Sequence, residues 1–279
     1  MDRFLFEEFV VPLDDKNLNG FYSMVLANAQ TKIEYGEKEY YNYYPQKSKR
    51  IQIVLETTRK NNNLNFDNMF FHHTSSSVWK LKIINPLTDF PNTYMASRED
   101  GTGMIVIRLV NEAVLGKKIE TGDIIEAQVS AFAINGEILE TEKDYEKSVQ
   151  KSQNGEKYLI NDGTLIPLNL IVNNNANLLE EIKAQKEHFK DNLLTYKGTI
   201  KYANDYDINM FDMELPKYYN VVINTEYGEL PIFFTKEFLN PYMKGFGEGN
   251  IIKGELFLSG DVCIKDYDKY VKENDLTVK

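Results

Sequence analysis

The sequence predicts a mainly β protein with a few helices, of the α+β class, in which an N-terminal β-rich part precedes two related small β-barrels. Short apolar runs alternate with polar residues and are separated by turns rich in glycine and asparagine, as in β proteins. One passage also recurs 127 positions later without a gap, since 99–101 aligns with 226–228 and Gly122 with Gly249. Recurrence of turn glycines at a fixed spacing indicates one supersecondary unit built twice.

Residues 1–75 are the predicted N-terminal β-rich part. Its apolar and aromatic runs favour strands, and its polar stretches favour loops. We expect a strand at 21–26, a hairpin over 33–44 that turns at Gly36, and a second strand at 51–55. A loop over 57–65 and a linker over 72–77 follow. A domain boundary near residue 75 follows.

The first repeat is expected over 76–140 and the second over 196–279. Both have the predicted order strand, hairpin, short helix, hairpin. In the first repeat this gives strands at 78–83, 104–110 and 123–132, a short helix at 111–119 and a tight hairpin at 135–136. In the second it gives a hairpin over 219–235, a short helix at 236–243, a strand at 251–258 and a turn at 259–261.

The segment 141–195 separates the two repeats. Residues 140–162 are charged and polar, which predicts an exposed connector. Residues 176–194 carry an apolar stripe at helical spacing with charged residues on the other face, which predicts an amphipathic helix. We expect this helix to pack on its own domain.

The order of elements in the repeats resembles an OB-fold, a small five-stranded barrel with a helix between its third and fourth strands. The resemblance lies in architecture, through the turn glycines Gly101, Gly122, Gly228 and Gly249 and the strands beside them, and in no family-specific motif. It implies two related OB-like barrels that engage a partner through their faces or loops. Other small barrels with a similar strand count remain open.

Composition restricts the compartment and the partners. The formal net charge of -10 argues against a surface that coats nucleic acid, which requires clustered Lys and Arg. No apolar run approaches the roughly 20 residues needed to span a bilayer. Cys263, the single cysteine, allows no intrachain disulfide, and its apolar neighbours predict a buried structural thiol. We therefore expect a cytoplasmic protein with no membrane partner.

The candidate ligand-binding surface is the segment 40–50, which combines tyrosine rings with cations. Its candidate residues are Tyr40, Tyr41, Tyr43, Tyr44, Lys47, Lys49 and Arg50. Exposed rings beside a basic strip are typical of surfaces that bind single-stranded nucleic acid, and exposed tyrosines also bind sugars or protein partners. The alternative is an amphipathic strand whose alternate tyrosines pack inward, followed by a solvated basic turn.

Metal and catalytic patterns are weak. The adjacent histidines His72 and His73 point to opposite faces of a strand, so a shared metal is not expected. Residues 205–216 begin like a calcium loop but lack its glycine and its closing glutamate. No phosphate-binding loop and no nucleophile elbow is present. We expect no cofactor and no metal.

The function predicted from the sequence is that of a non-catalytic cytoplasmic binding protein. A protein partner or self-association is favoured, because the chain is acidic and shows one basic strip. One alternative is binding of single-stranded nucleic acid or a glycan through 40–50. Another is a metal-dependent hydrolase or nuclease that uses carboxylates near 205–214, among them Asp205, Asp207 and Asp212.

Overall fold

The structure is a computed structural model, and it describes residues 15–45, 51–61, 63–87, 92–111, 119–151, 159–168, 170, 193–206, 218–235, 245–265, 272 and 277–278. The described elements confirm the mainly β class. The helices are α2 (Asp15–Asn28) and α3 (Glu142–Lys151). The strands are β1 (Thr31–Tyr35), β2 (Lys38–Tyr43), β3 (Ile51–Lys60), β4 (Asn63–His73), β5 (Val78–Pro86), β6 (Thr93–Arg98), β7 (Ile105–Leu109), β8 (Ile124–Leu139), β9 (Thr164–Pro167), β10 (Leu194–Tyr206), β11 (Tyr218–Thr225), β12 (Gly228–Thr235), β13 (Ile251–Val262) and β14 (Thr277–Val278).

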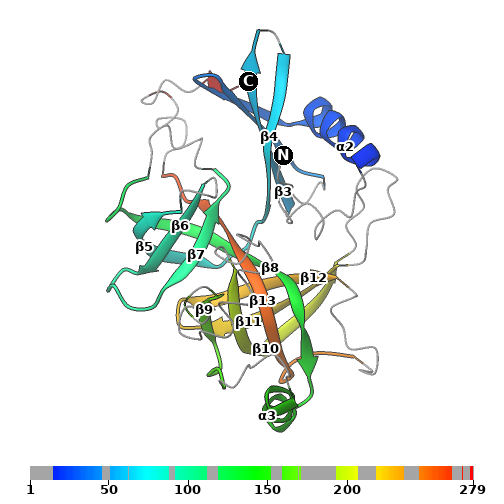
Figure 1. The fold of residues 1–279 in the computed structure, drawn as a ribbon, viewed down its shortest axis with the longest axis vertical. Coiled ribbons are helices and arrows are strands. Elements are labelled where there is room, and N and C mark those ends of the chain that lie inside the picture. Colours follow the sequence, from blue (N-terminus) through cyan, green and yellow to red (C-terminus); the bar gives the residue numbers. More distant parts are fainter. Residues whose placement is uncertain are drawn as a thin grey trace, which may run out of the picture.

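Strands β1 to β4 of the N-terminal part, together with β14 near the C-terminus, form a five-stranded sheet in the order β14-β1-β2-β3-β4, which we call the N-terminal sheet (Figure 1). The hairpin expected over 33–44 is confirmed as β1 and β2, with Gly36 at a φ of 60° in the turn. The loop expected over 57–65 is wrong, because β3 and β4 pair along this stretch. Asn61 at a φ of 50° makes the turn between them, a conformation that asparagine tolerates better than most residues.

The strand expected over 21–26 is also wrong, since these residues lie in helix α2. Phe21 and Val25 are both buried, and they lie four residues apart on one helical face. They pack against Ile53, Leu55 and Phe71 of the N-terminal sheet. Burial on that face favours the helix over the β propensity of the aromatic run.

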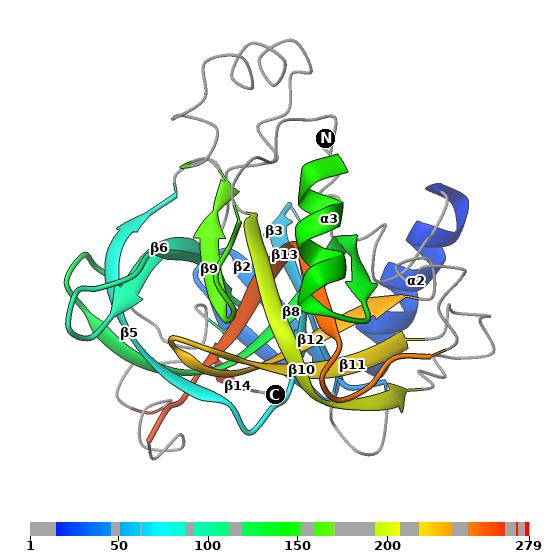
Figure 2. The ribbon, with the colours of Figure 1, turned by 90° about the horizontal axis from the view of Figure 1, so that it is seen from below.

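The remaining strands form a sheet that closes into two rings. Strands β5, β6, β7, β13 and β8 make the first ring, which returns from β8 to β5. Strands β10, β11, β12, β8 and β13 make the second ring, which returns from β13 to β10. The pairs β7–β13 and β12–β8 are parallel, and the other pairs in the rings are antiparallel. Strands β8 and β13 therefore belong to both rings, and they cross the middle of the molecule in Figures 1 and 2.

The two halves of this sheet make matching backbone contacts. The N–H of Gly122 donates to the carbonyl of Ile83, and the N–H of Gly249 donates to the carbonyl of Ile200, both at 2.8 Å. The pairings β5–β6 and β10–β11 each have a bulge directly after these two isoleucines. The segments β5 to β8 and β10 to β13 thus follow the same pairing plan.

The antiparallel pair β8–β13, which we call the seam, replaces two turns that the sequence predicts. The hairpin expected at Asn135 and Gly136 is wrong, because β8 continues to Leu139 and pairs there with β13. The turn expected at 259–261 is wrong for the same reason, because β13 runs on to Val262. Each long strand leaves its own repeat and enters the other ring. Neither ring is consequently made from 76–140 or 196–279 alone.

One apolar core fills both rings, and a side chain of the first ring anchors the second. Trp79 on β5 is buried, and its Nε1–H donates to the carbonyl of Glu229 on β12 at 3.1 Å. Its ring stacks on Tyr227 with 5.2 Å between the ring centroids. A buried indole with a satisfied N–H stabilises such a junction strongly.

The predicted connector over 140–162 is mostly exposed in its described residues and contains a helix that the sequence does not predict. Helix α3 begins after Thr141, whose hydroxyl accepts from the N–H of Asp144 at 3.3 Å, as an N-cap does. The helix expected over 176–194 lies outside the described residues except for its end, where Leu194 begins β10. The short helices expected over 111–119 and 236–243 fall almost wholly outside them as well. Within the described residues, no helix is long and apolar enough to cross a membrane.

Candidate functional site

The outer face of the seam carries three cross-strand pairs that change from apolar to polar along the strands. Side chains alternate between the faces of a strand, so every second pair points outward. The outward pairs are Phe132 with Phe257, Ser130 with Ser259, and Gln128 with Asp261. The N-terminal sheet covers the first two pairs, and the third opens into a cavity.

The serine pair holds the end of strand β4. The hydroxyl of Ser259 donates to the carbonyl of Phe71 at 2.8 Å, so the ring Nδ1–H of His72 donates to the Ser259 oxygen at 3.0 Å. The N–H of His73 donates to the Ser130 hydroxyl at 3.2 Å. Burial, with a smaller contribution from the neighbouring His73, lowers the pKa of His72 to about 3. His72 is therefore a neutral side chain that docks the N-terminal sheet on the seam.

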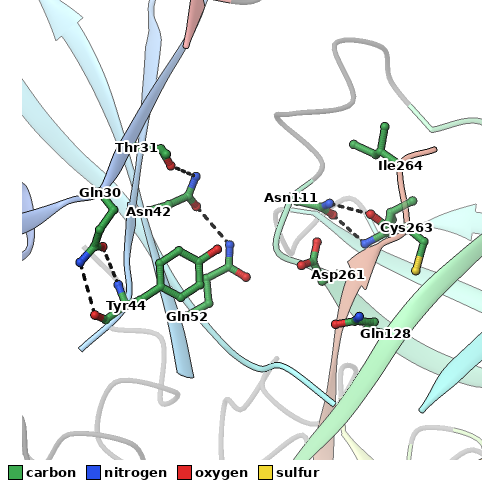
Figure 3. Close-up of a pocket in the computed structure, with 11 residues that line it drawn as sticks. Gln30, Thr31, Asn42, Tyr44, Gln52, Asn111, Gln128, Asp261, Cys263 and Ile264 are labelled. Carbon is green, nitrogen blue, oxygen red and sulfur yellow. Dashed lines mark hydrogen bonds between the residues drawn. The ribbon is translucent and has the colours of Figure 1, made fainter. Parts of the chain in front are cut away.

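Beyond this contact lies a cavity of about 500 Å³ between the N-terminal sheet and the first ring. This volume lies within the range of small-molecule and side-chain pockets. Its lining residues are Gln30, Thr31, Asn42, Tyr44, Gln52, Asn111, Gln128, Asp261, Val262, Cys263 and Ile264. Figure 3 shows the two walls facing each other across a gap. Carboxamides from both walls make the cavity polar.

Hydrogen bonds fix the wall made by the N-terminal sheet. The amide of Gln30 bonds the backbone of Tyr44, accepting from its N–H at 2.8 Å and donating to its carbonyl at 3.4 Å. Asn42 donates to the Thr31 hydroxyl at 3.1 Å and accepts from the Gln52 amide at 3.2 Å. These contacts hold the carboxamides in set directions, which makes the wall a preorganised surface.

On the opposite wall, one side-chain amide is hydrogen-bonded through both its oxygen and its nitrogen, and two other side chains have no hydrogen-bond partner among the described residues. Asn111 bonds the backbone N–H and carbonyl of Val262, both at 2.9 Å. The side chains of Gln128 and Asp261, neighbours across the seam, have no such partner and are half-buried. Loss of hydration raises the pKa of Asp261 to about 6. The carboxylate is thus ionised at neutral pH at a cost to the fold.

Asp261→Asn is expected to stabilise the protein at pH 7.5 by about 2 kcal/mol, less than the ~3 kcal/mol of the full pKa shift because water in the cavity screens the charge. A carboxyl group whose pKa is raised on folding stabilises the folded state at pH values below its unfolded pKa. For Asp261 this contribution is lost as pH rises through about 6. Urea unfolding at pH 7.5 and pH 3.5 checks this, with the exposed Glu248→Gln as control. Equal stability of wild type and Asp261→Asn at pH 7.5 would contradict it.

The lone cysteine lies at the edge of the cavity, and its thiol is exposed, so the expected buried thiol is wrong. Strand β13 ends at Val262, which leaves Cys263 beyond the core. Desolvation raises the pKa of the Cys263 thiol, and the negative charge of Asp261 raises it further. The thiol is therefore protonated at neutral pH, which makes it a poor nucleophile.

The structure separates the tyrosines of the predicted surface 40–50. Tyr40 and Tyr43 are buried in two different apolar clusters, on opposite faces of β2. The hydroxyl of Tyr41 donates at 2.6 Å to Glu39, whose pKa is lowered to about 2, mainly by Arg59. Of these four rings, Tyr44 lines the cavity. Lys47, Lys49 and Arg50 lie outside the described residues.

The predicted carboxylate site near 205–214 lies outside the described part of the chain, apart from the backbone of Asp205 at the end of β10. Among the described residues, no group of three or more His, Cys, Asp or Glu side chains is placed to hold a metal ion. Sequence reasoning did not single out Gln128 and Asp261, because their proximity depends on a pairing between the two repeats. The nearest signal was the polar residue that ends the expected turn at 259–261.

Most cations of the described residues neutralise carboxylates. The cations within 4.0 Å of a carboxylate oxygen are Lys32, Lys38, Arg59, Lys80, Arg98, Lys147, Lys197, Lys201 and Lys253. No protein-family model, no curated protein and no solved structure matches this chain.

Proposed function

We propose that this chain is a non-catalytic binding protein that engages a protein partner, and that the cavity between the N-terminal sheet and the seam is its principal recognition site. The observation that carries the proposal is the lining of that cavity, which is polar, preorganised by hydrogen bonds and about 500 Å³ in volume. Clefts at the junction of two structural units are common ligand sites.

The barrels that frame the cavity are OB-like within this proposal. Each ring has five strands and closes, with its third strand parallel to the strand taken from the other repeat. An internal duplication accounts for the matching hydrogen bonds at Gly122 and Gly249. Exchange of the long strands then joins the two barrels into one body.

The faces by which OB-folds usually bind ligands are occupied here, which favours the cavity. Those faces lie over the second and third strands of the barrel. In the first ring all five residues of β7 are buried, and Arg108 lies 4.1 Å from the ring centroid of Phe70 in the N-terminal sheet. In the second ring, Tyr218 and Phe233 pack in the apolar cluster that includes α2. The N-terminal part thus takes the place of a ligand on both barrels.

The chemistry of the cavity supports binding over catalysis. Among the described lining residues, the one carboxyl group has no histidine beside it, and the one thiol has a raised pKa. General acid–base or nucleophilic catalysis requires a nucleophile or proton carrier with a positioned partner. Binding of single-stranded nucleic acid or a glycan through 40–50 remains the alternative, for which Tyr44 is the ring with access to the cavity.

The test is a pull-down of the tagged protein from a lysate of its own organism at low and moderate salt, followed by size-exclusion chromatography with light scattering. We expect one protein that withstands moderate salt and elutes with the chain at a fixed stoichiometry. Retention of nucleic acid alone, lost as salt rises, would replace the proposal with the single-strand alternative. Failure to retain any partner, with binding to a glycan or oligonucleotide panel, would also overturn it.

A further inference from the structure

The cavity contains an acidic group that none of the described residues compensates. Among the described lining residues, Asp261 is the one ionisable carboxyl, and none is a Lys, Arg or His. The titratable groups near it are the thiol of Cys263 and, on the facing wall, the phenol of Tyr44, and the carboxylate of Glu126 acts on that thiol. His72 lies behind the neighbouring Ser259 and is neutral. No described group on either wall supplies a positive charge to Asp261.

An unpaired, partly desolvated carboxylate is costly, and the cost is offset when a cation binds to it. Elsewhere in the described structure the buried carboxylates are compensated, since Glu39 pairs with Lys32 and Arg59, and Glu56 pairs with Lys38. The exception at Asp261 coincides with the cavity. The formal net charge of -10 adds a field that attracts cations.

The groups near Asp261 suit the N–H donors of such a cation. Gln128 lies directly across the seam from Asp261, and its side chain has no hydrogen-bond partner among the described residues. On the facing wall the Gln52 side-chain nitrogen donates to Asn42. The Gln52 side-chain oxygen is therefore directed away from Asn42, as a hydrogen-bond acceptor. The ring of Tyr44 lies beside Gln52 in Figure 3 and offers an aromatic surface to a planar cation.

We infer that the cavity is a binding site for a guanidinium or primary ammonium group, held by the Asp261 carboxylate with the Gln128 and Gln52 amide oxygens and the Tyr44 ring. The inference rests on the proposed function, because an Arg or Lys side chain of the partner protein is one source of this group. A free small amine or guanidine is the other source. Anionic ligands are disfavoured, since the described lining residues include a carboxylate and no cation.

The first experiment uses methylguanidinium as the probe and the amide side-chain signals of Gln52 and Gln128 as the NMR readout. At pH 7.5 we expect saturable shifts of these two signals in wild type and in Glu248→Gln, at constant ionic strength. In Asp261→Asn the affinity falls at least tenfold. At pH 5 wild type also binds about tenfold more weakly, because roughly one tenth of a carboxyl with a pKa of about 6 is ionised there.

A second variant tests the site by filling it. Gln128→Lys places an internal ammonium across the seam from Asp261, where opposite charges attract. We expect this variant to bind methylguanidinium at least tenfold more weakly than wild type while keeping its fold. Shifts that do not saturate, or that are equal in wild type, Asp261→Asn and Gln128→Lys, would overturn the inference.

Repeating the pull-down with wild type and Asp261→Asn distinguishes a basic side chain of a partner protein from a free amine or guanidine. It also tests the cation site separately from the proposed protein-binding function. A partner protein retained by wild type and lost from Asp261→Asn identifies a basic side chain as the occupant. Methylguanidinium binding without a retained protein identifies a free amine or guanidine as the occupant, and the proposed protein-binding function then fails. A partner retained equally by both, together with no methylguanidinium binding, overturns the inference and leaves the proposed function standing.

Discussion

Gly254→Ala is expected to lower the free energy of unfolding by about 4 kcal/mol, from backbone strain and overpacking together. Gly254 has a φ of 150°, a conformation that residues with a Cβ rarely adopt. A Cβ atom there would lie 2.0 Å from the carbonyl oxygen of Asn135 and 2.6 Å from the Cα of Gly136. Both contacts are backbone atoms of the facing strand, so neither can move without breaking the seam. Urea unfolding followed by circular dichroism measures the loss.

Gly247→Ala is the matched control, because a Cβ there meets no atom within 4 Å. We expect this variant to change the free energy of unfolding by less than about 0.5 kcal/mol. Because the seam belongs to both rings, the Gly254→Ala protein should still unfold in one transition, at lower urea. A loss below about 1 kcal/mol, or separate unfolding of the two rings, would contradict a shared seam.

Acid is expected to destabilise the wild-type protein through His72 by about 2 kcal/mol at pH 5 and about 3 kcal/mol at pH 4, relative to pH 7.5. Its pKa is lowered on folding from the ordinary histidine value of 6.5 to about 3, so the unfolded chain binds the proton more readily between these two pH values. The stability is complete above about pH 6.5 and is lost as pH falls toward 3. Protonation would place a charge between Ser130 and Ser259.

His72→Gln isolates this contribution, because glutamine keeps an N–H donor for Ser259 and does not titrate. Asp261 changes stability with the opposite sign over part of the same pH range, and this change cancels when the two proteins are compared at each pH. We expect wild type to exceed His72→Gln in stability at pH 7.5 and to lose that advantage by pH 4. The same difference between the two proteins at both pH values would show that His72 is not buried in its neutral form.

Local patterns predict those parts of the fold whose cause is local. The β1–β2 hairpin, the β11–β12 hairpin and the opening of β8 and β13 after Gly122 and Gly249 follow from turn glycines and alternation. The turns expected at 135–136 and 259–261 fail, because the partner that extends each strand lies in the other repeat. A turn-forming pair of residues is accommodated within a strand when long-range pairing outweighs its preference.

The candidate site is less predictable from the sequence than the hairpins, because it also depends on long-range pairing. A tyrosine-rich strand beside a basic strip predicts a ligand surface, but inward packing depends on what covers each face of β2, and both faces are covered. Tyr44, at the end of that strand, is the predicted ring that lines the cavity. Asp261 and Gln128 become neighbours through the seam, across 133 positions of sequence. No periodicity within either repeat places them together.

The most direct test of the cavity as a cation site is the pKa of Asp261 itself, followed through its carboxyl ¹³C shift by NMR with and without saturating methylguanidinium. The structure predicts a pKa of about 6 in the free protein and a lower pKa with the cation bound, because an opposite charge favours the ionised carboxyl. A free-protein pKa near the ordinary aspartate value of 3.8 that does not respond to methylguanidinium would contradict both the desolvated carboxylate and the site built on it.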